Sequence, residues 1–160
     1  MKRTVYVETS VISYLTARPS RTILGAAHQQ VTLAWWERRS RYELLVSRVV
    51  WQECAAGDPE AARTRLAAME GLGMLAVTQD MVELASELVT RGALPVAAAE
   101  DSLHIAIATL HRVDFLLTWN CRHIANPLVQ EAIAEYFEQR GFFLPVICTP
   151  EELLGGKDDG

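Results

Sequence analysis

The chain has 160 residues, of which 50% are hydrophobic and 22% charged, with a formal net charge of −5. This composition indicates a globular rather than a disordered protein, and the length fits one domain that buries its core without disulfide or metal staples. The negative charge argues against broad, non-specific binding to nucleic acid, which depends on a basic surface, although a local basic patch is compatible with it.

The three cysteines, Cys54, Cys121 and Cys148, are odd in number and lack the spacing of a disulfide framework. They predict free thiols in a reducing compartment, and so a cytoplasmic protein. Cys121 and His123 are a weak zinc signal, because no second pair of ligands accompanies them. No apolar run approaches the roughly 20 residues of a membrane span, and no charged region with an apolar core opens the chain. Neither membrane insertion nor export is expected.

Five short apolar runs have the character of buried strands. They lie at residues 4–7, 44–47, 74–77, 115–119 and 146–148. The stretches between them are long enough for helices, and this alternation predicts an α/β fold with a parallel sheet. We expect one domain over residues 1–154 and a flexible tail over the glycine and charged residues 155–160.

Helix starts are marked where a capping side chain precedes a proline. These pairs are Asp58-Pro59, Asn126-Pro127 and Thr149-Pro150. Residues 22–39 have the pattern of an amphipathic helix, and its apolar stripe from Leu24 to Trp35 is expected in the core. A break at residues 92–95 separates helices predicted over 81–91 and 96–112.

Four polar side chains fall where a predicted strand ends or a neighbouring helix begins. Glu8 follows the first strand, Glu53 lies beyond the second, Asp101 opens the helix before the fourth, and Asn120 closes the fourth. Ligands collect at the carboxyl ends of parallel strands, so these four residues are expected to converge on one edge of the sheet.

Three converging carboxylates without matching arginines would raise one another's pKa values, and a divalent cation would remove that cost. Oxygen ligands, with no Cys or His at the matching positions, suit Mg²⁺ or Mn²⁺ rather than Zn²⁺. A water bound to such an ion can attack a phosphodiester. His104, three residues beyond Asp101, lies on the same helix face and is placed to orient it, although a half-buried structural role is commoner. His28 and His111 are expected at the surface.

Three segments, VYVETSVISYL, SRVVWQE and EDSLHIAIATLHRVDFLLTWNCRHIAN, resemble the PIN domain, and particularly the VapC-type toxins of toxin–antitoxin pairs. The resemblance reaches to about Thr149. It implies a PIN-like α/β/α sandwich with a central, mostly parallel sheet of about four to five strands, and a Mg²⁺- or Mn²⁺-dependent endoribonuclease. Carried over by position, it implies metal-binding acids with two supporting hydroxyls. The acids are Glu8, Glu53 and Asp101, and the hydroxyls belong to Ser10 and Thr118.

The chain departs from the family at two places. Glu8 stands where Asp is usual, so its carboxylate reaches one methylene further, and Asn120 stands where Asp is common. A neutral amide should weaken a second metal more than the first, so we expect one tightly held ion and an optional second. Two roles stay open for Asn120: it assists catalysis through its amide oxygen, or it orients water or phosphate.

The family also implies partners, namely an RNA substrate, a homodimer and a protein antitoxin that covers the acidic groove. The helix over residues 22–39 is a plausible contact for such a partner. Four arginines follow or flank the motif segments and are hypothesised to guide the RNA backbone. They are Arg18, Arg21, Arg48 and Arg122.

Two other enzyme classes fit less well. A phosphatase with an aspartyl nucleophile would need a second acid two residues after the first, where this chain has Ser10. Gly71-Leu72-Gly73 precedes a strand and lacks the third glycine of a dinucleotide-binding loop. The rival that stays open is a PIN-like domain that has lost most or all of its catalysis and binds RNA or protein, which Glu8 and Asn120 make credible.

Overall fold

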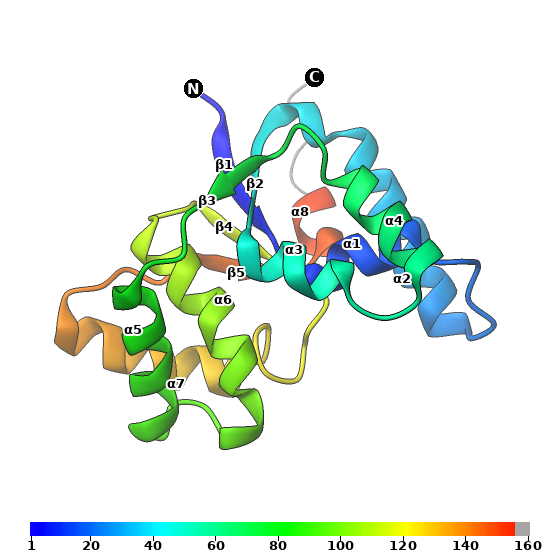
Figure 1. The fold of residues 1–160 in the computed structure, drawn as a ribbon. Helices are drawn as coiled ribbons and strands as arrows, with labels where there is room; N and C mark the ends of the chain where they lie inside the picture. Colours follow the sequence, from blue (N-terminus) through cyan, green and yellow to red (C-terminus); the bar gives the residue numbers. More distant parts are fainter. Residues whose placement is uncertain (156–160) are drawn as a thin grey trace.

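A computed structural model describes residues 1–155, and its centre is a five-stranded sheet (Figure 1). The strands are β1 (Arg3–Val7), β2 (Tyr42–Ser47), β3 (Gly73–Leu75), β4 (Phe115–Leu117) and β5 (Val146–Cys148). Every neighbouring pair runs parallel, in the order β3-β2-β1-β4-β5. The predicted α/β class and parallel sheet are confirmed, and each predicted strand overlaps an observed one.

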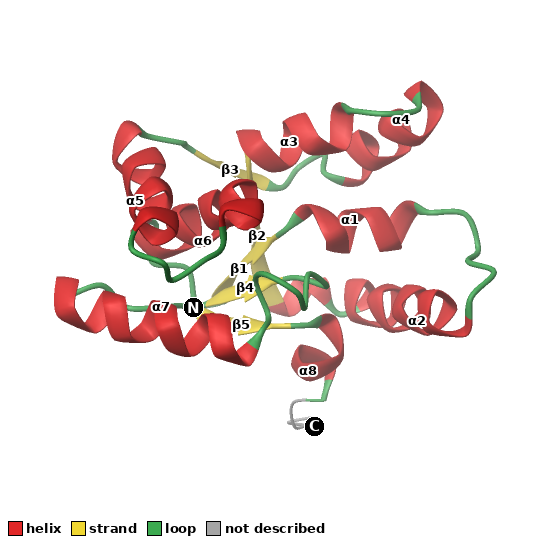
Figure 2. Cartoon of the chain, turned by 90° about the horizontal axis from the view of Figure 1, so that it is seen from below, coloured by secondary structure: helices red, strands yellow, loops and turns green. Residues whose placement is uncertain are grey.

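Helices connect the strands and cover both sides of the sheet. They are α1 (Thr9–Thr16), α2 (Ile23–Glu37), α3 (Arg48–Ala55), α4 (Pro59–Ala68), α5 (Gln79–Thr90), α6 (Ala99–Leu110), α7 (Pro127–Arg140) and α8 (Pro150–Leu154). Figures 1 and 2 show α5, α6 and α7 grouped on one side of the strands, and the other helices grouped on the opposite side. The layered architecture predicted for the chain is therefore present.

The strand order reverses between β1 and β4. Strands β2 and β3 follow on one side of β1, whereas β4 and β5 lie on its other side. Val7 pairs with Leu117, and the backbone N–H of Glu8 donates to the carbonyl of Leu117 at 3.0 Å. Crevices at such a switch point are where parallel α/β sheets bind ligands. Glu8 and Thr118, the first residues after β1 and β4, are therefore side by side at this crevice.

The three predicted proline-marked helix starts are confirmed. Asp58, Asn126 and Thr149 are the N-caps of α4, α7 and α8, and each side chain accepts a backbone hydrogen bond. The helix predicted over 96–112 instead begins with a 3₁₀ turn, Val96–Ala98, and continues as α6. Ala98 has no side chain that can cap α6, so this turn uses backbone groups, with Ala98 N–H donating to Pro95 O at 2.9 Å.

The helix predicted over residues 22–39 is confirmed as α2, but its apolar stripe is not wholly buried. Trp35 is 1% exposed, whereas Leu24 is 67% exposed and Ile23 is 93% exposed. The buried residues of α2 lie in its second half, where the helix packs against α1 and α8. The expectation that Leu24 lies in the core is wrong, because the first turn of α2 has no such cover.

Three other expectations concern the ends and surface of the molecule. The tail predicted over residues 155–160 lies outside the described residues except for Gly155. Within residues 1–155, no helix has the length and apolar composition that crossing a membrane requires. Cys54, Cys121 and Cys148 are free thiols, as predicted.

Candidate active site

Glu8 lies at the carboxyl end of β1, where its backbone caps α1 and its side chain folds back toward the helix. Oε2 accepts a hydrogen bond from the backbone N–H of Ser10 at 2.6 Å. Glutamate is not a preferred N-cap residue, since its side chain is longer than that of Ser, Thr, Asp or Asn. The additional methylene nevertheless leaves the carboxylate against the first turn of α1, where the helix dipole favours a negative charge.

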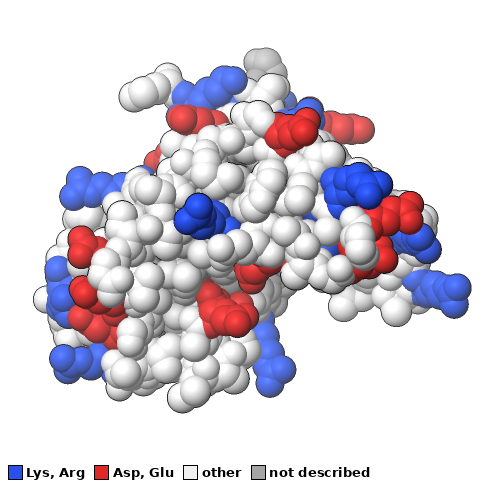
Figure 3. Space-filling model, in the orientation of Figure 1, with Lys and Arg blue, Asp and Glu red and all other residues white. Residues whose placement is uncertain are grey.

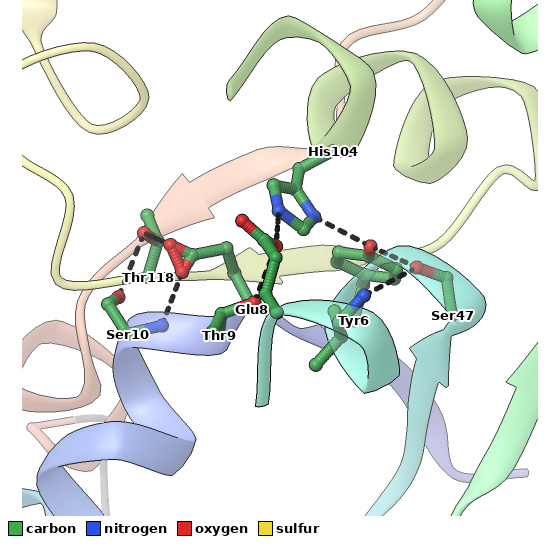
Figure 4. Close-up of polar contacts among 9 residues, drawn as sticks. Tyr6, Glu8, Thr9, Ser10, Ser47, His104 and Thr118 are labelled. Atoms are coloured by element: carbon green, nitrogen blue, oxygen red, sulfur yellow. Dashed lines mark hydrogen bonds and ion pairs between the residues drawn. The ribbon is translucent and has the colours of Figure 1, made fainter. Parts of the chain in front are cut away.

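Thr118 and Ser10 hold the carboxylate of Glu8 from two elements, as Figure 4 shows. The hydroxyl of Thr118 donates to Glu8 Oε1 at 3.2 Å, and Ser10 Oγ lies 3.4 Å from the same hydroxyl. Ser10 Oγ also accepts from the backbone N–H of Trp119 at 2.8 Å. The two residues predicted to support the site therefore lie around Glu8 and connect the ends of β1 and β4.

Glu53 extends from α3 and joins the helices on either side of it. Its Oε1 accepts from the hydroxyl of Thr9 at 2.7 Å and lies 2.6 Å from Nε2 of His104. An ionised carboxylate can only accept, so Nε2 carries the proton. The sequence left open whether His104 orients Asp101 on its own helix or has a half-buried structural role, and the structure gives it a different partner. The imidazole instead reaches Glu53, 51 residues away in sequence, because its helix faces α3 across the end of the sheet.

A chain of hydroxyl groups fixes the other nitrogen of His104 (Figure 4). Tyr6 Oη lies 2.8 Å from Nδ1 of His104 and 2.8 Å from Oγ of Ser47, all within the protein interior. Ser47 Oγ in turn accepts from the backbone N–H of Val50 at 3.4 Å, at the start of α3. Since each hydroxyl can donate or accept, this chain satisfies Nδ1 whether the imidazole is neutral or protonated.

Asp101, in the first turn of α6, has a different partner. Its Oδ2 lies 2.8 Å from Nδ1 of His123, in the loop after β4, and the imidazole is again the donor. Within residues 1–155, the hydrogen bonds of Asn120 reach backbone and hydroxyl groups and no acid. Its amide oxygen accepts from the backbone N–H of His123 at 3.0 Å, and its own N–H donates to Thr118 Oγ1 at 2.9 Å. Asn120 thus shapes the loop that carries His123.

The electrostatic environment differs among the acids. Burial raises the pKa of Glu8, although the charge of His104 and the hydrogen bonds from Ser10 and Thr118 lower it. Partial burial acts in the same direction on Glu53, but the hydrogen bond and charge of His104, with the hydrogen bond from Thr9, outweigh it and lower its pKa. Burial disfavours the charged form of His104, but the hydrogen bond to Glu53 and the charges of Glu8, Glu53 and Asp101 raise its pKa overall. All three acids therefore act on one imidazole.

The site becomes more exposed from Glu8 outward. Glu8 is 4% exposed, whereas the side chains of Asp101 and Glu53 are 25% and 36% exposed. Figure 3 shows that this face of the molecule is hollowed between the lobe of α5, α6 and α7 and the lobe of α1, α2 and α4. Acidic side chains lie at the border of the hollow, and basic side chains lie both beside it and on the flanks. An acidic site of this kind is open to a substrate from one side.

A metal ion fits the chemistry of these acids, although a three-ligand centre is not preformed. Among residues 1–155, no group of three or more His, Cys, Asp or Glu side chains is arranged to hold one ion. Mg²⁺, however, keeps several waters and commonly binds through one or two carboxylates. Glu8 is buried without an ion pair to Lys or Arg among the described residues, so its charge is uncompensated except by His104. A hard cation facing Glu8 would supply that compensation.

The four arginines proposed to guide RNA are exposed and come from three segments. Arg18 and Arg21 lie between α1 and α2, Arg48 begins α3, and Arg122 lies in the loop beside His123. Arg18 lines a polar groove of about 530 Å³ together with Asp58, Glu60 and Arg65. Arg122 lies in the loop that contacts Asp101 through His123, and Arg48 lies on the same helix as Glu53.

Comparison with known proteins gives a likeness in structure. No protein-family model matches the chain, and no curated protein matches it. Among solved structures, VapBC2 from Rickettsia felis, bound to a DNA fragment from its promoter, aligns with a TM-score of 0.57 and 14% identity, covering 91% of this chain and 98% of that one. The chain has the PIN-like fold of VapC toxins.

Two further VapC-type or toxin–antitoxin structures share this PIN-like fold. The sarcin-ricin-loop-cleaving toxin VapC20 from Mycobacterium tuberculosis aligns with a TM-score of 0.57 and 18% identity, over 74% of this chain and 91% of its own. A toxin–antitoxin complex from Klebsiella pneumoniae aligns with a TM-score of 0.56 and 16% identity, over 91% of this chain and 97% of its own. At identities this low, the structural likeness establishes the fold alone, and the chemistry of the site has to be derived from the residues of this chain.

Sequence reasoning placed the acids but missed most of their partners. Thr9, Tyr6 and Ser47 carried no signal in the sequence, and His123 was weighed only as a zinc ligand with Cys121. One usable signal was the spacing of Asn120 and His123, since an Asn at a strand end often accepts from a backbone N–H a few residues on. His28, expected at the surface, is half-buried and stacks on Trp119 at 4.0 Å between ring centroids.

Proposed function

We propose that the protein is a divalent-metal-dependent endoribonuclease and the toxin component of a toxin–antitoxin pair. The observation that carries the proposal is that hydrogen bonds link Glu8, Glu53 and Asp101 to neighbouring elements at one end of a sheet whose fold is that of VapC toxins. Glu8 is bound by Thr118 after β4, Glu53 by His104 of α6, and Asp101 by His123 in the loop after β4. These acids come from three separate elements. Acids that have no arginine ion pair within residues 1–155 suit a hard cation, and such a cation can assist the hydrolysis of a phosphodiester.

Glu8, Glu53 and Asp101 would hold Mg²⁺ or Mn²⁺. When bound, the ion supplies a water of lowered pKa and offsets the charge that develops on phosphate oxygens. Glu8 is fixed by Ser10 N–H and Thr118, while Oε2 of Glu53 and Oδ1 of Asp101 accept no hydrogen bond from residues 1–155. Those two oxygens are therefore not engaged within residues 1–155, and they belong to side chains that are 36% and 25% exposed.

Cleavage of RNA by the purified protein tests the proposal. A structured hairpin and an unstructured RNA are incubated with Mn²⁺ or with EDTA, and Asp101→Asn is compared with the wild type. We expect cleavage that depends on the metal and is lost in Asp101→Asn. Glu100→Gln is the matched control, because Glu100 is an exposed acid in the same helical turn and should cleave normally. Identical RNA patterns for wild type and Asp101→Asn, or indifference to EDTA, would contradict the proposal.

A binding module without catalysis is the second reading, and two observations favour it. Asn120 is engaged with the backbone of its own loop, and no three-ligand group is preformed among the described residues. This reading predicts that the protein binds Mn²⁺ or RNA and leaves the RNA intact. The same incubation, followed by a filter-binding assay, separates the two readings.

The partner that we propose is a protein antitoxin, and the protein itself is proposed to be a homodimer. The first turn of α2 offers an uncovered apolar contact, since Ile23 and Leu24 are 93% and 67% exposed. Co-expression with the product of a neighbouring small reading frame should yield a complex that co-purifies. Ile23→Asp with Leu24→Asp should weaken that complex, and unchanged co-purification would move the contact elsewhere.

A further inference from the structure

Asp101 and His123 form a contact that joins α6 to the loop after β4. Oδ2 of Asp101 and Nδ1 of His123 are 2.8 Å apart, across 22 residues of sequence. Both side chains are partly exposed, at 25% and 17%. The pair is therefore at the open side of the site and is not part of the core.

The loop that carries His123 is closed without its imidazole. Asn120 O accepts from the backbone N–H groups of Ile124 and Ala125, at 3.2 Å and 2.8 Å, and Asn120 Oδ1 accepts from His123 N–H at 3.0 Å. Asn120 N–H is bound to Thr118 Oγ1, the hydroxyl that also donates to Glu8. The position of the His123 backbone is thus fixed relative to Glu8 by interactions that involve no part of the imidazole ring.

The two exposed acids are held in matching ways. Glu53 receives an imidazole N–H from His104, and Asp101 receives one from His123. In each case one carboxylate oxygen is bound and the other accepts no hydrogen bond within residues 1–155. A carboxylate restrained in this way keeps one oxygen directed and unpaired, which lowers the entropy lost when a cation binds.

We infer that His123 is a positioning residue, which restrains Asp101 so that its free Oδ1 is directed toward the cation. The inference rests on the proposed function and refines it. Asn120 acts on Asp101 indirectly. Its side chain accepts from the backbone N–H of His123, and the imidazole of His123 binds Asp101. The family commonly has Asp at position 120, and this chain has Asn there, so the loop after β4 acts on the ion through His123 and Asp101.

Three substitutions of His123 test this geometry. His123→Asn places a side-chain N–H₂ near the position of Nδ1 and should preserve the contact, whereas His123→Ala removes it and His123→Gln displaces the donor. We expect His123→Ala and His123→Gln to lose about 10- to 100-fold in Mn²⁺ affinity, as for other groups that orient a metal ligand. His123→Asn should stay within a few-fold of the wild type. Cys121→Ser, an exposed change in the same loop, is the control.

The measurements are Mn²⁺ affinity by isothermal titration calorimetry, kcat and KM for RNA, and thermal unfolding in EDTA. A merely structural role would lower the unfolding temperature of His123→Ala and would not be rescued selectively by Asn. A positioning role leaves the unfolding temperature in EDTA near that of the wild type and lowers the Mn²⁺ affinity and kcat. Loss of stability in all three variants without selective rescue would overturn the inference.

A double-mutant cycle with Asp101→Asn separates this inference from the proposed function. If His123 acts through Asp101, His123→Ala adds little to the defect of Asp101→Asn, whereas independent effects would multiply. A normal His123→Ala beside a defective Asp101→Asn overturns the inference and leaves the nuclease proposal standing. A wild type that neither binds Mn²⁺ nor cleaves RNA overturns both.

Discussion

The carboxylate of Glu8 and the carboxylates of Glu53 and Asp101 are held by different kinds of group. Glu8 is buried between two strand ends and is bound by a backbone N–H and a threonine hydroxyl. Glu53 and Asp101 extend from helices, are partly exposed, and are each bound by an imidazole. The inner acid is thus fixed by the sheet, and the outer acids are fixed by side chains from other helices and loops.

The two kinds of partner have different effects: those of Glu8 fix its position, whereas that of Glu53 also balances its charge. The groups that hydrogen-bond to Glu8 determine its position but carry no formal charge, and burial raises its pKa although the charge of His104 opposes that shift. The groups around Glu53 include a fully buried imidazole whose own pKa is raised, so that pair supports the charged forms of both partners. We therefore expect Glu8 to govern metal-dependent chemistry and His104 to govern the stability of the metal-free protein.

Glu8→Gln should have the largest effect on activity and a small, favourable effect on stability. Loss of a ligating carboxylate should lower metal-dependent RNA cleavage by more than the about 10- to 100-fold typical of groups that only orient a ligand. The unfolding free energy in EDTA at neutral pH should not fall, because a neutral amide removes a buried charge. Wild-type cleavage by Glu8→Gln would show that the inner acid is not the metal ligand.

His104→Ala should have the largest effect on stability. It leaves a cavity and removes the buried partner of Tyr6 and Glu53, so we expect a loss of about 3 kcal/mol in unfolding free energy. Tyr6→Phe removes only one hydroxyl and should cost about 1 kcal/mol. Urea denaturation in EDTA measures both, and equal losses would mean that the hydroxyl chain, and not the imidazole, is the main support.

The pH dependence of stability should identify the same imidazole. The folded protein raises the pKa of His104 above its ordinary value of 6.5, so the stabilisation is complete below that pH and is lost as pH rises through the folded-state pKa. Because the pKa of Glu8 is also raised, ionisation of Glu8 likewise lowers the unfolding free energy as the pH rises above 4.5. In EDTA, the unfolding free energy should therefore fall more steeply above pH 6.5 in the wild type than in His104→Asn. Parallel curves would contradict the assignment.

Asn120 should show the smallest effects. Asn120→Asp keeps an oxygen that accepts from His123 N–H, so stability should change by less than about 0.5 kcal/mol, whereas Asn120→Ala should lose about 1 kcal/mol. Mn²⁺ affinity should follow the same order, because the amide acts through the loop. A gain in Mn²⁺ affinity of tenfold or more in Asn120→Asp would show instead that this position faces the ion directly.

The features predictable from sequence are those that local patterns control. Apolar runs and their spacing predicted the parallel sheet, and proline-marked caps predicted three helix starts. Glu8 could be placed because it directly follows a strand. The predictions of burial failed where burial depends on which elements pack against a helix. Leu24 is an example, because α1 and α8 cover only part of the apolar stripe to which it belongs.

The sequence by itself determined which residue types stand at the carboxyl ends of the strands, since strand and helix periodicity are local properties of the chain. Only the tertiary structure decided that His104 binds Glu53, that His123 binds Asp101, and that Asn120 holds its own loop. The physical reason is that a helical side chain has several neighbours within hydrogen-bonding reach. Which of them it meets depends on how helices far apart in sequence pack over the end of the sheet.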